Sequence, residues 1–156
     1  SDMDFKEEFV GETFGRINKE EAHLLLKELE AYILRIGGSR ILEERIDFGL
    51  ISPYKAQVQY LRGKIKGSAT LRPYRSLITV NTVDGFQGQE RDVIFISLVR
   101  ANEEGQIGFL NDLRRMNVAI TRARMKLVIL GEAATLGHHA FYKQLLEYVK
   151  KVNGRQ

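Results

Sequence analysis

Residues 92–99 read Asp-Val-Ile-Phe-Ile-Ser-Leu-Val, and this nearly continuous apolar run is the clearest indication of the fold. Such a run is typical of a β-strand that is covered on both faces, as the inner strands of parallel sheets are. Residues 127–130, Leu-Val-Ile-Leu, form a second run of this kind, which ends at Gly131. We expect both segments to be buried strands.

Helical patterns alternate with strand patterns through the rest of the chain. Asn18 followed by Glu21 is close to a capping box, and it predicts a helix that stops at Gly37-Gly38. Apolar spacing predicts helices over residues 55–66, 111–121 and 139–152, and strands over residues 46–51 and 76–81. This alternation predicts an α/β fold, with a mostly parallel sheet and helices on both faces.

The composition is that of one ordinary globular domain. The chain has 156 residues, of which 44% are hydrophobic and 28% charged. No apolar run approaches the roughly 18 residues that a membrane span needs, so we expect no membrane partner. Cysteine is absent and the three histidines are scattered, so we expect no metal ligands here. A reducing, cytoplasmic setting fits this cysteine usage.

Charge is uneven along the chain. Residues 1–50 hold 7 basic and 12 acidic side chains, whereas residues 51–156 hold 17 basic and 8 acidic ones. The basic second part favours a phosphate-bearing partner, either a nucleotide or a nucleic acid. A solvated surface rich in lysine explains the same charges equally well.

Three junctions between strands and their neighbours draw attention, because ligands of parallel sheets bind beyond the carboxyl ends of strands. They lie after Ile51, after Asn81 and before Lys126. At the first, Ser52-Pro53-Tyr54-Lys55-Ala56-Gln57 places proline at a helix start and a tyrosine at the rim, where it can stack on a base. A capped helix with a packing tyrosine is the alternative.

The second junction is unusually polar. Residues 80–92 read Val-Asn-Thr-Val-Asp-Gly-Phe-Gln-Gly-Gln-Glu-Arg-Asp, and packing alone does not require so many hydrogen-bonding side chains at a strand end. Glycines let the backbone approach a ligand, and free N–H groups at a short helix start can hold phosphates. A simple surface turn is the alternative.

The third junction is rich in arginine. Residues 108–124 read Gly-Phe-Leu-Asn-Asp-Leu-Arg-Arg-Met-Asn-Val-Ala-Ile-Thr-Arg-Ala-Arg, so a helix is expected to deliver Arg122 and Arg124 to the edge of the sheet. Guanidinium groups bind phosphate oxygens in pairs and suit the transition state of phosphoryl transfer. Arginines at a helix C-terminus also complement its dipole, which is the alternative.

The order and spacing of the three segments together resemble superfamily 1 helicases. Residues 52–57 resemble motif IV, residues 82–90 resemble motif V, and residues 114–124 resemble motif VI. The similarity is greatest to the 5′-to-3′ branch that contains the nonsense-mediated-decay helicase, and it covers roughly residues 14 to 150.

This resemblance implies the second RecA-like domain of such a helicase, over residues 18–153, after a tag remnant and connector in residues 1–17. It implies a P-loop NTPase fold without its own Walker A sequence, since G-x-x-x-x-G-K-[ST] does not occur in the chain. ATP and Mg²⁺ are the implied cofactors, with the metal held by a first RecA-like domain absent from this chain. The implied partners are that domain and single-stranded DNA or RNA.

The resemblance also implies roles for single residues. Arg122 corresponds to the arginine finger, and is the implied catalytic residue. The implied nucleotide-binding residues are Glu90, Gly88, Arg124 and Gln87, with Gln87 also linking the two sites. The implied nucleic-acid contacts are Pro53, Tyr54, Thr82, Val83 and Asp84. By this reading the isolated chain hydrolyses no ATP.

Two other classes of function remain open from the residues alone. One is a RecA-like module that binds nucleic acid without ATPase activity, against which the presence of Arg122 and Glu90 argues. The other is an unrelated nucleotide-dependent enzyme with a similar sheet, such as a transferase. That enzyme would need a glycine-rich loop after the first strand, and Leu50-Ile51-Ser52-Pro53 offers none.

Overall fold

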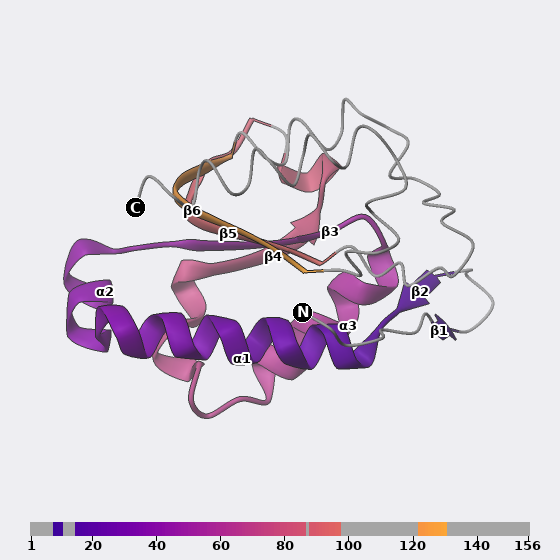
Figure 1. Ribbon diagram of the computed structural model, residues 1–156, viewed down its shortest axis with the longest axis horizontal. Helices are drawn as coiled ribbons and strands as arrows, with labels where there is room; N and C mark the ends of the chain where they lie inside the picture. Colours follow the sequence, from indigo (N-terminus) through magenta and orange to yellow (C-terminus); the bar gives the residue numbers. More distant parts are fainter. Residues whose placement is uncertain (1–7, 11–14, 87, 98–121, 131–156) are drawn as a thin grey trace.

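A computed structural model describes residues 8–10, 15–86, 88–97 and 122–130 (Figure 1). Its centre is a four-stranded sheet in the order β4-β3-β5-β6, and all its pairings are parallel. The strands are β3 (Phe48–Ser52), β4 (Ile78–Thr82), β5 (Arg91–Ser97) and β6 (Ala123–Leu130). The predicted parallel α/β arrangement is therefore confirmed for these strands.

Helices α1 (Lys19–Ile36) and α3 (Lys55–Lys66) lie together on one face of the sheet (Figure 1). The predicted capping box is present, because the Asn18 side chain accepts a hydrogen bond from the Glu21 N–H at 2.9 Å. Gly37, with φ at 99°, ends α1 as expected, since residues with a Cβ rarely adopt this conformation. The predicted helix over residues 55–66 has the same bounds as α3.

Several shorter elements were not predicted. Helix α2 (Gly38–Glu44) follows α1 directly, and the 3₁₀ helices η2 (Arg72–Leu77) and η3 (Asp84–Phe86) flank β4. Residues 1–17, expected to be irregular, contain an antiparallel pair of strands, β1 (Glu8–Val10) and β2 (Gly15–Ile17). The predicted helices over residues 111–121 and 139–152 lie outside the described residues.

Both faces of the sheet are buried, as the apolar runs predicted. One face packs against α1 and α3 through alternate strand residues, among them Phe48, Leu50, Val93 and Phe95. The other face carries Ile51, Ile94, Ile96 and Leu127, none of which exposes any surface. The described part of the chain contains no helix that is long and apolar enough to span a membrane.

Candidate functional site

Three of the residues predicted to contact the nucleic-acid strand lie at the carboxyl end of the sheet. Ser52 pairs in register with Thr82, so the ends of β3 and β4 are level. Pro53 and Tyr54 follow directly after Ser52, and Tyr54 is the N-cap residue of α3. Both are half-buried, which leaves part of each side chain at the surface. The structure thus brings Pro53, Tyr54 and Thr82 to one end of the sheet.

A buried polar cluster holds α3 against this end of the sheet. The Gln57 side chain, which is fully buried, donates hydrogen bonds to Asn18 O at 3.0 Å and Ser97 Oγ at 3.1 Å. Its carbonyl accepts from the Asn18 N–H at 3.0 Å, and the Ser97 hydroxyl donates to the Glu21 carboxylate. A buried amide whose oxygen and nitrogen are both paired, as in Gln57, fixes the geometry around it. Gln57 therefore sets the position of the helix that carries Tyr54.

The loop after β4 is shaped by close contacts. A Cβ on Gly85 would lie 2.2 Å from Asn81 Cγ, so only glycine fits beside that side chain. The Gly85 N–H donates to Thr82 Oγ1 at 3.3 Å. The side chain of Val83 is only 2% exposed, so Val83 can meet a ligand through its backbone alone. The side chain of Asp84, by contrast, is exposed. Gly88 has φ at 77° and open space where a side chain would stand, and Gln87 lies outside the described residues.

The same loop runs from the carboxyl end of the sheet back to its amino end. Phe86, which is fully buried, packs over β3 at Gly49, where a Cβ would lie 2.9 Å from its ring. The chain then reaches Arg91 at the start of β5. Residues 83–90 therefore connect the two ends of the sheet physically.

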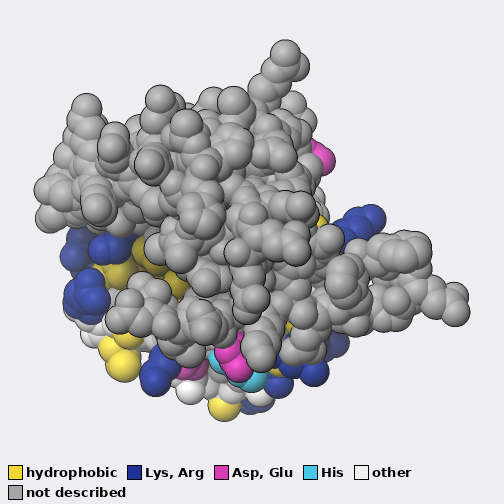
Figure 2. Space-filling view, turned by 45° about the vertical axis from the view of Figure 1, so that its right-hand side comes forward, with side chains coloured by type: hydrophobic (Ala, Val, Ile, Leu, Met, Phe, Trp, Pro, Cys, Tyr) yellow, Lys and Arg dark blue, Asp and Glu magenta, His cyan; other side chains and the backbone are white. Residues whose placement is uncertain are grey.

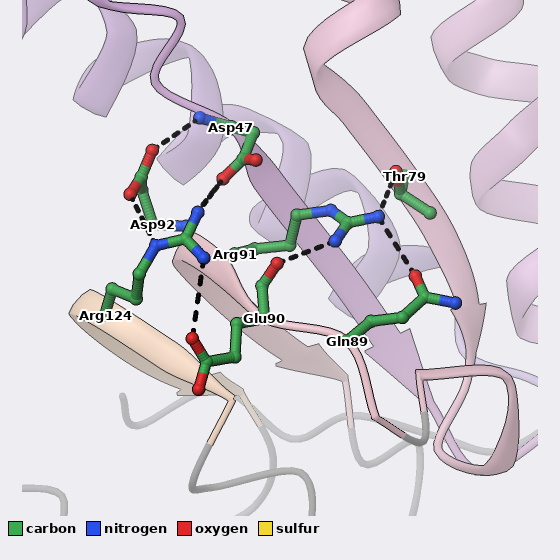
Figure 3. Close-up of polar contacts among 7 residues, drawn as sticks. All are labelled: Asp47, Thr79, Gln89, Glu90, Arg91, Asp92 and Arg124. Atoms are coloured by element: carbon green, nitrogen blue, oxygen red, sulfur yellow. Dashed lines mark hydrogen bonds and ion pairs between the residues drawn. The ribbon is translucent and has the colours of Figure 1, made fainter.

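Arg124 and three carboxylates form an ion cluster at the amino end of the sheet (Figure 3). The guanidinium lies 3.0 Å from Asp92, 3.2 Å from Asp47 and 3.6 Å from Glu90. Asp47 and Asp92 are also tied to each other, because the backbone N–H of each donates to the carboxylate of the other. The cluster joins the beginnings of β3, β5 and β6.

The carboxylates of the ion cluster stabilise the charged form of Arg124. The hydrogen bond to Asp92 raises the pKa of the Arg124 guanidinium above its usual value, and the charges of Asp47 and Glu90 act in the same direction. Arg124 thus carries a charge that its own domain already compensates. Glu90, whose side chain is 53% exposed, has only the longest of the three contacts. Glu90 is consequently the member best able to exchange its partner for a ligand.

Arg91, which the sequence analysis did not single out, organises the neighbouring surface. Its guanidinium lies 5.5 Å from the centre of the Phe86 ring and donates to Thr79 Oγ1 at 3.3 Å (Figure 3). It also donates to Gln89 Oε1 at 3.1 Å and to the Glu90 carbonyl at 2.7 Å. These bonds fix the backbone that carries Glu90. The available signal was the arginine within the polar junction of residues 80–92.

Arg122 lies beside this surface. Its carbonyl accepts a hydrogen bond from the Arg91 N–H at 2.9 Å, which places it level with the start of β5. The side chain is half-buried, and its buried Nε atom has no hydrogen-bond partner in the part of the chain that the structure describes. Most buried donors in folded proteins are paired, so this one calls for an explanation.

The expectation that ligand-binding groups gather at carboxyl ends of strands is wrong for the third junction. Arg122 and Arg124 stand at the beginning of β6, and Ala123 pairs in register with Arg91. Since all four strands are parallel, these arginines lie at the end of the sheet opposite to Tyr54 and Thr82. The candidate residues therefore form two groups, one at each end.

A family model described as "AAA domain" matches residues 1–134. The chain therefore belongs to this family, in which it is a RecA-like domain of the superfamily 1 helicase type.

The relatives agree with this assignment. "Probable helicase MAGATAMA 3" of Arabidopsis thaliana is 38% identical over 143 residues, which is 92% of this chain and 17% of that protein. "Regulator of nonsense transcripts 1 homolog" of Drosophila melanogaster is 38% identical over 149 residues, 93% of this chain and 12% of that protein. "Helicase SEN1" of Saccharomyces cerevisiae is 37% identical over 150 residues, 93% and 6% respectively. The chain thus spans less than a fifth of each of these relatives.

Proposed function

We propose that this chain is the second motor domain of an ATP-dependent nucleic-acid helicase. It supplies one wall of an ATP site whose other wall belongs to a first RecA-like domain of the same polypeptide. The observation that carries this proposal is the buried Nε of Arg122, which has no acceptor. The named helicases among its relatives support the same class of activity.

The energetics of Arg122 favour a role in which it meets an anion. A buried donor without a partner costs about 1–3 kcal/mol, and more when it is charged. Phosphate oxygens would remove this cost, because guanidinium groups pair with them through two parallel hydrogen bonds. An arginine that gains its partner only when two domains close can stabilise the charge of the transition state, which is the role of an arginine finger.

The neighbouring residues fit a nucleotide. Glu90 is 53% exposed and accepts hydrogen bonds, as a ribose hydroxyl requires, and the backbone at Gly88 is open to a close approach. Among the described residues, no group of three or more His, Asp or Glu could hold a metal ion. The resemblance to superfamily 1 helicases, rather than this absence, is the reason that we assign Mg²⁺ to the first domain and only phosphate and ribose contacts to this chain. ATP, when bound, supplies the phosphoryl group that is hydrolysed.

The carboxyl end of the sheet is proposed to contact the nucleic-acid strand. Tyr54 offers a ring for base stacking, while Pro53, Thr82, Asp84 and the backbone of Val83 line the same rim. Residues 83–90 run from this rim to Glu90, so a shift at either end moves the same loop. Gln87, within that loop, is the proposed link between the two sites. DNA and RNA fit these contacts equally, and the cytoplasmic setting remains a prediction.

The isolated chain provides the first test. With only one wall of the site, it should bind ATP weakly and show no measurable Mg²⁺-dependent hydrolysis, with or without a nucleic-acid strand. Single-turnover assays with labelled ATP measure this directly. Robust turnover by the chain alone would contradict the shared-site proposal. Weak binding without turnover, restored to full activity in the longer polypeptide, is the expected result.

A further inference from the structure

A groove of about 380 Å³ lies beside β4, and none of its lining residues belongs to the two groups of candidate residues. Its walls come from the second half of α3, from η2 and from the first three residues of β4. Three of its seven lining residues are cationic, namely Arg62, Lys66 and Arg75, and none is acidic.

The cations of the groove are available to a ligand. Lys66 and Arg75 are exposed, and neither side chain forms a hydrogen bond or ion pair with the described part of the chain. Arg62 is held in place, because its Nε and Nη2 donate to the Val80 carbonyl at 3.0 and 2.7 Å. Its Nη1 group makes no such bond. One anchored cation and two cations without side-chain partners among the described residues therefore line one groove.

The sequence around the groove is strongly basic. Residues 48–83 contain six basic side chains, Lys55, Arg62, Lys64, Lys66, Arg72 and Arg75, and no Asp or Glu. Among the coloured side chains in the view of Figure 2, Lys and Arg groups stand at several places and acidic groups at fewer. Arg124, by contrast, is surrounded by three carboxylates. Among the described residues, no carboxylate lines the groove to compensate its three cations, and this charge favours a polyanion.

We infer that this groove binds backbone phosphates of a nucleic acid, as an additional contact beyond the strand-binding rim. The groove and the rim share β4, since Val80 lines the groove and Thr82 ends the strand. Lys66 is the last residue of α3 and Tyr54 is its N-cap, so the two are separated by roughly 18 Å along the helix, a distance that a nucleic acid covers within several nucleotides. This inference uses the rim of the proposed function, but not its ATP site.

An acidic peptide fits the groove less well. Peptides that dock on the side of a strand need its free backbone groups for pairing. At β4, which is the outer strand of the described sheet, Arg62 already covers the Val80 carbonyl. Phosphodiester groups need only the cations, and they are bound regardless of base sequence.

The test compares two double variants of the full-length protein that remove equal charge from the same two elements. Lys66→Gln with Arg75→Gln removes the two cations of the groove other than Arg62. Lys64→Gln with Arg72→Gln is the matched control, since neither residue lines the groove. Affinity for a labelled oligonucleotide is measured without ATP between about 50 and 200 mM salt. Circular dichroism verifies that both variants are folded.

The groove variant should bind about tenfold more weakly at the low-salt end, and its log K against log salt slope should decrease by roughly 1.4 for two lost phosphate contacts on a single strand. The control should keep the wild-type slope. Equal slopes for both double variants would overturn the inference. So would unchanged oligonucleotide binding with loss of binding to polyglutamate, which would assign an acidic protein partner. Because no step involves ATP, this result is independent of whether Arg122 acts as a finger.

Discussion

The side chain of Arg91 crosses strand β3 at Gly49, where a Cβ would lie 3.1 Å from Arg91 Cγ. Without a side chain at position 49, the arginine can extend from β5 over β3 and reach Thr79 on β4. Phe86 and Ile94 fill the remaining space, at 2.9 and 2.7 Å from the same Cβ position. One glycine thus accommodates both the loop that joins the two ends of the sheet and the arginine that anchors it.

Gly49→Ala should therefore destabilise the protein. The added methyl group overlaps three side chains, and overpacking of this kind costs about 1–3 kcal/mol. Gly63→Ala is the matched control, because it lies in α3 with open space around it, and it should stabilise by about 0.5–1 kcal/mol. Urea unfolding monitored by circular dichroism measures both. If Gly49→Ala were as stable as the wild type, Phe86 would not pack over β3 as described.

Tyr32 should make stability fall at alkaline pH. Burial raises the pKa of this tyrosine above its ordinary value of 10.0, although the nearby Arg35 opposes the shift. The unfolded chain therefore loses this proton first, so the contribution is fully present below pH 10.0 and is lost as pH rises above it. Tyr32→Phe should flatten the decrease in unfolding free energy over that range. Parallel curves for the two proteins would contradict the assignment.

Tyr54→Ala should weaken strand binding far more than nucleotide binding. Stacking of a base on an aromatic ring contributes about 1–3 kcal/mol, so the dissociation constant for a single strand should rise about tenfold. The KM for ATP should stay within about twofold, because Tyr54 and Arg122 lie at opposite ends of the sheet. Fluorescence anisotropy and a coupled ATPase assay measure the two quantities.

Tyr54→Phe is the control for this prediction, since it keeps the ring and removes the hydroxyl. It should bind the strand nearly as well as the wild type. A larger effect of Tyr54→Ala on the KM for ATP than on strand binding would reassign the rim to the nucleotide.

The sequence predicted best what depends on local chemistry. The Asn18 cap, the stop at Gly37 and the bounds of α3 follow from side chains near them in the chain, and all three are confirmed. Apolar runs predicted β5 and β6 because burial on both faces leaves a compositional signature. The short helices α2 and η2 were missed, since neither carries an apolar stripe long enough to be periodic.

Relationships between distant residues were not predictable. The Asp47–Asp92–Arg124 cluster joins three strand beginnings, and nothing local distinguishes Asp47 from other surface carboxylates. The sequence predicts Gly49 only as part of a strand, because its further role depends on Phe86 and Arg91, which cross above it. The placement of Arg122 at the amino end of the sheet required the register of β6 against β5. The sequence predicts the contact residues one by one, whereas their division into two groups follows from the topology of the sheet.

The kcat of the full-length Arg122→Ala variant tests the central claim most directly. If this guanidinium completes a shared ATP site, kcat should fall by about 10³- to 10⁵-fold, while the dissociation constant for ATP changes little. Arg122→Lys, which keeps the charge without the two-pronged geometry, should recover only a small part of the rate. A kcat equal to that of the wild type, measured with saturating ATP and nucleic acid, would contradict the account.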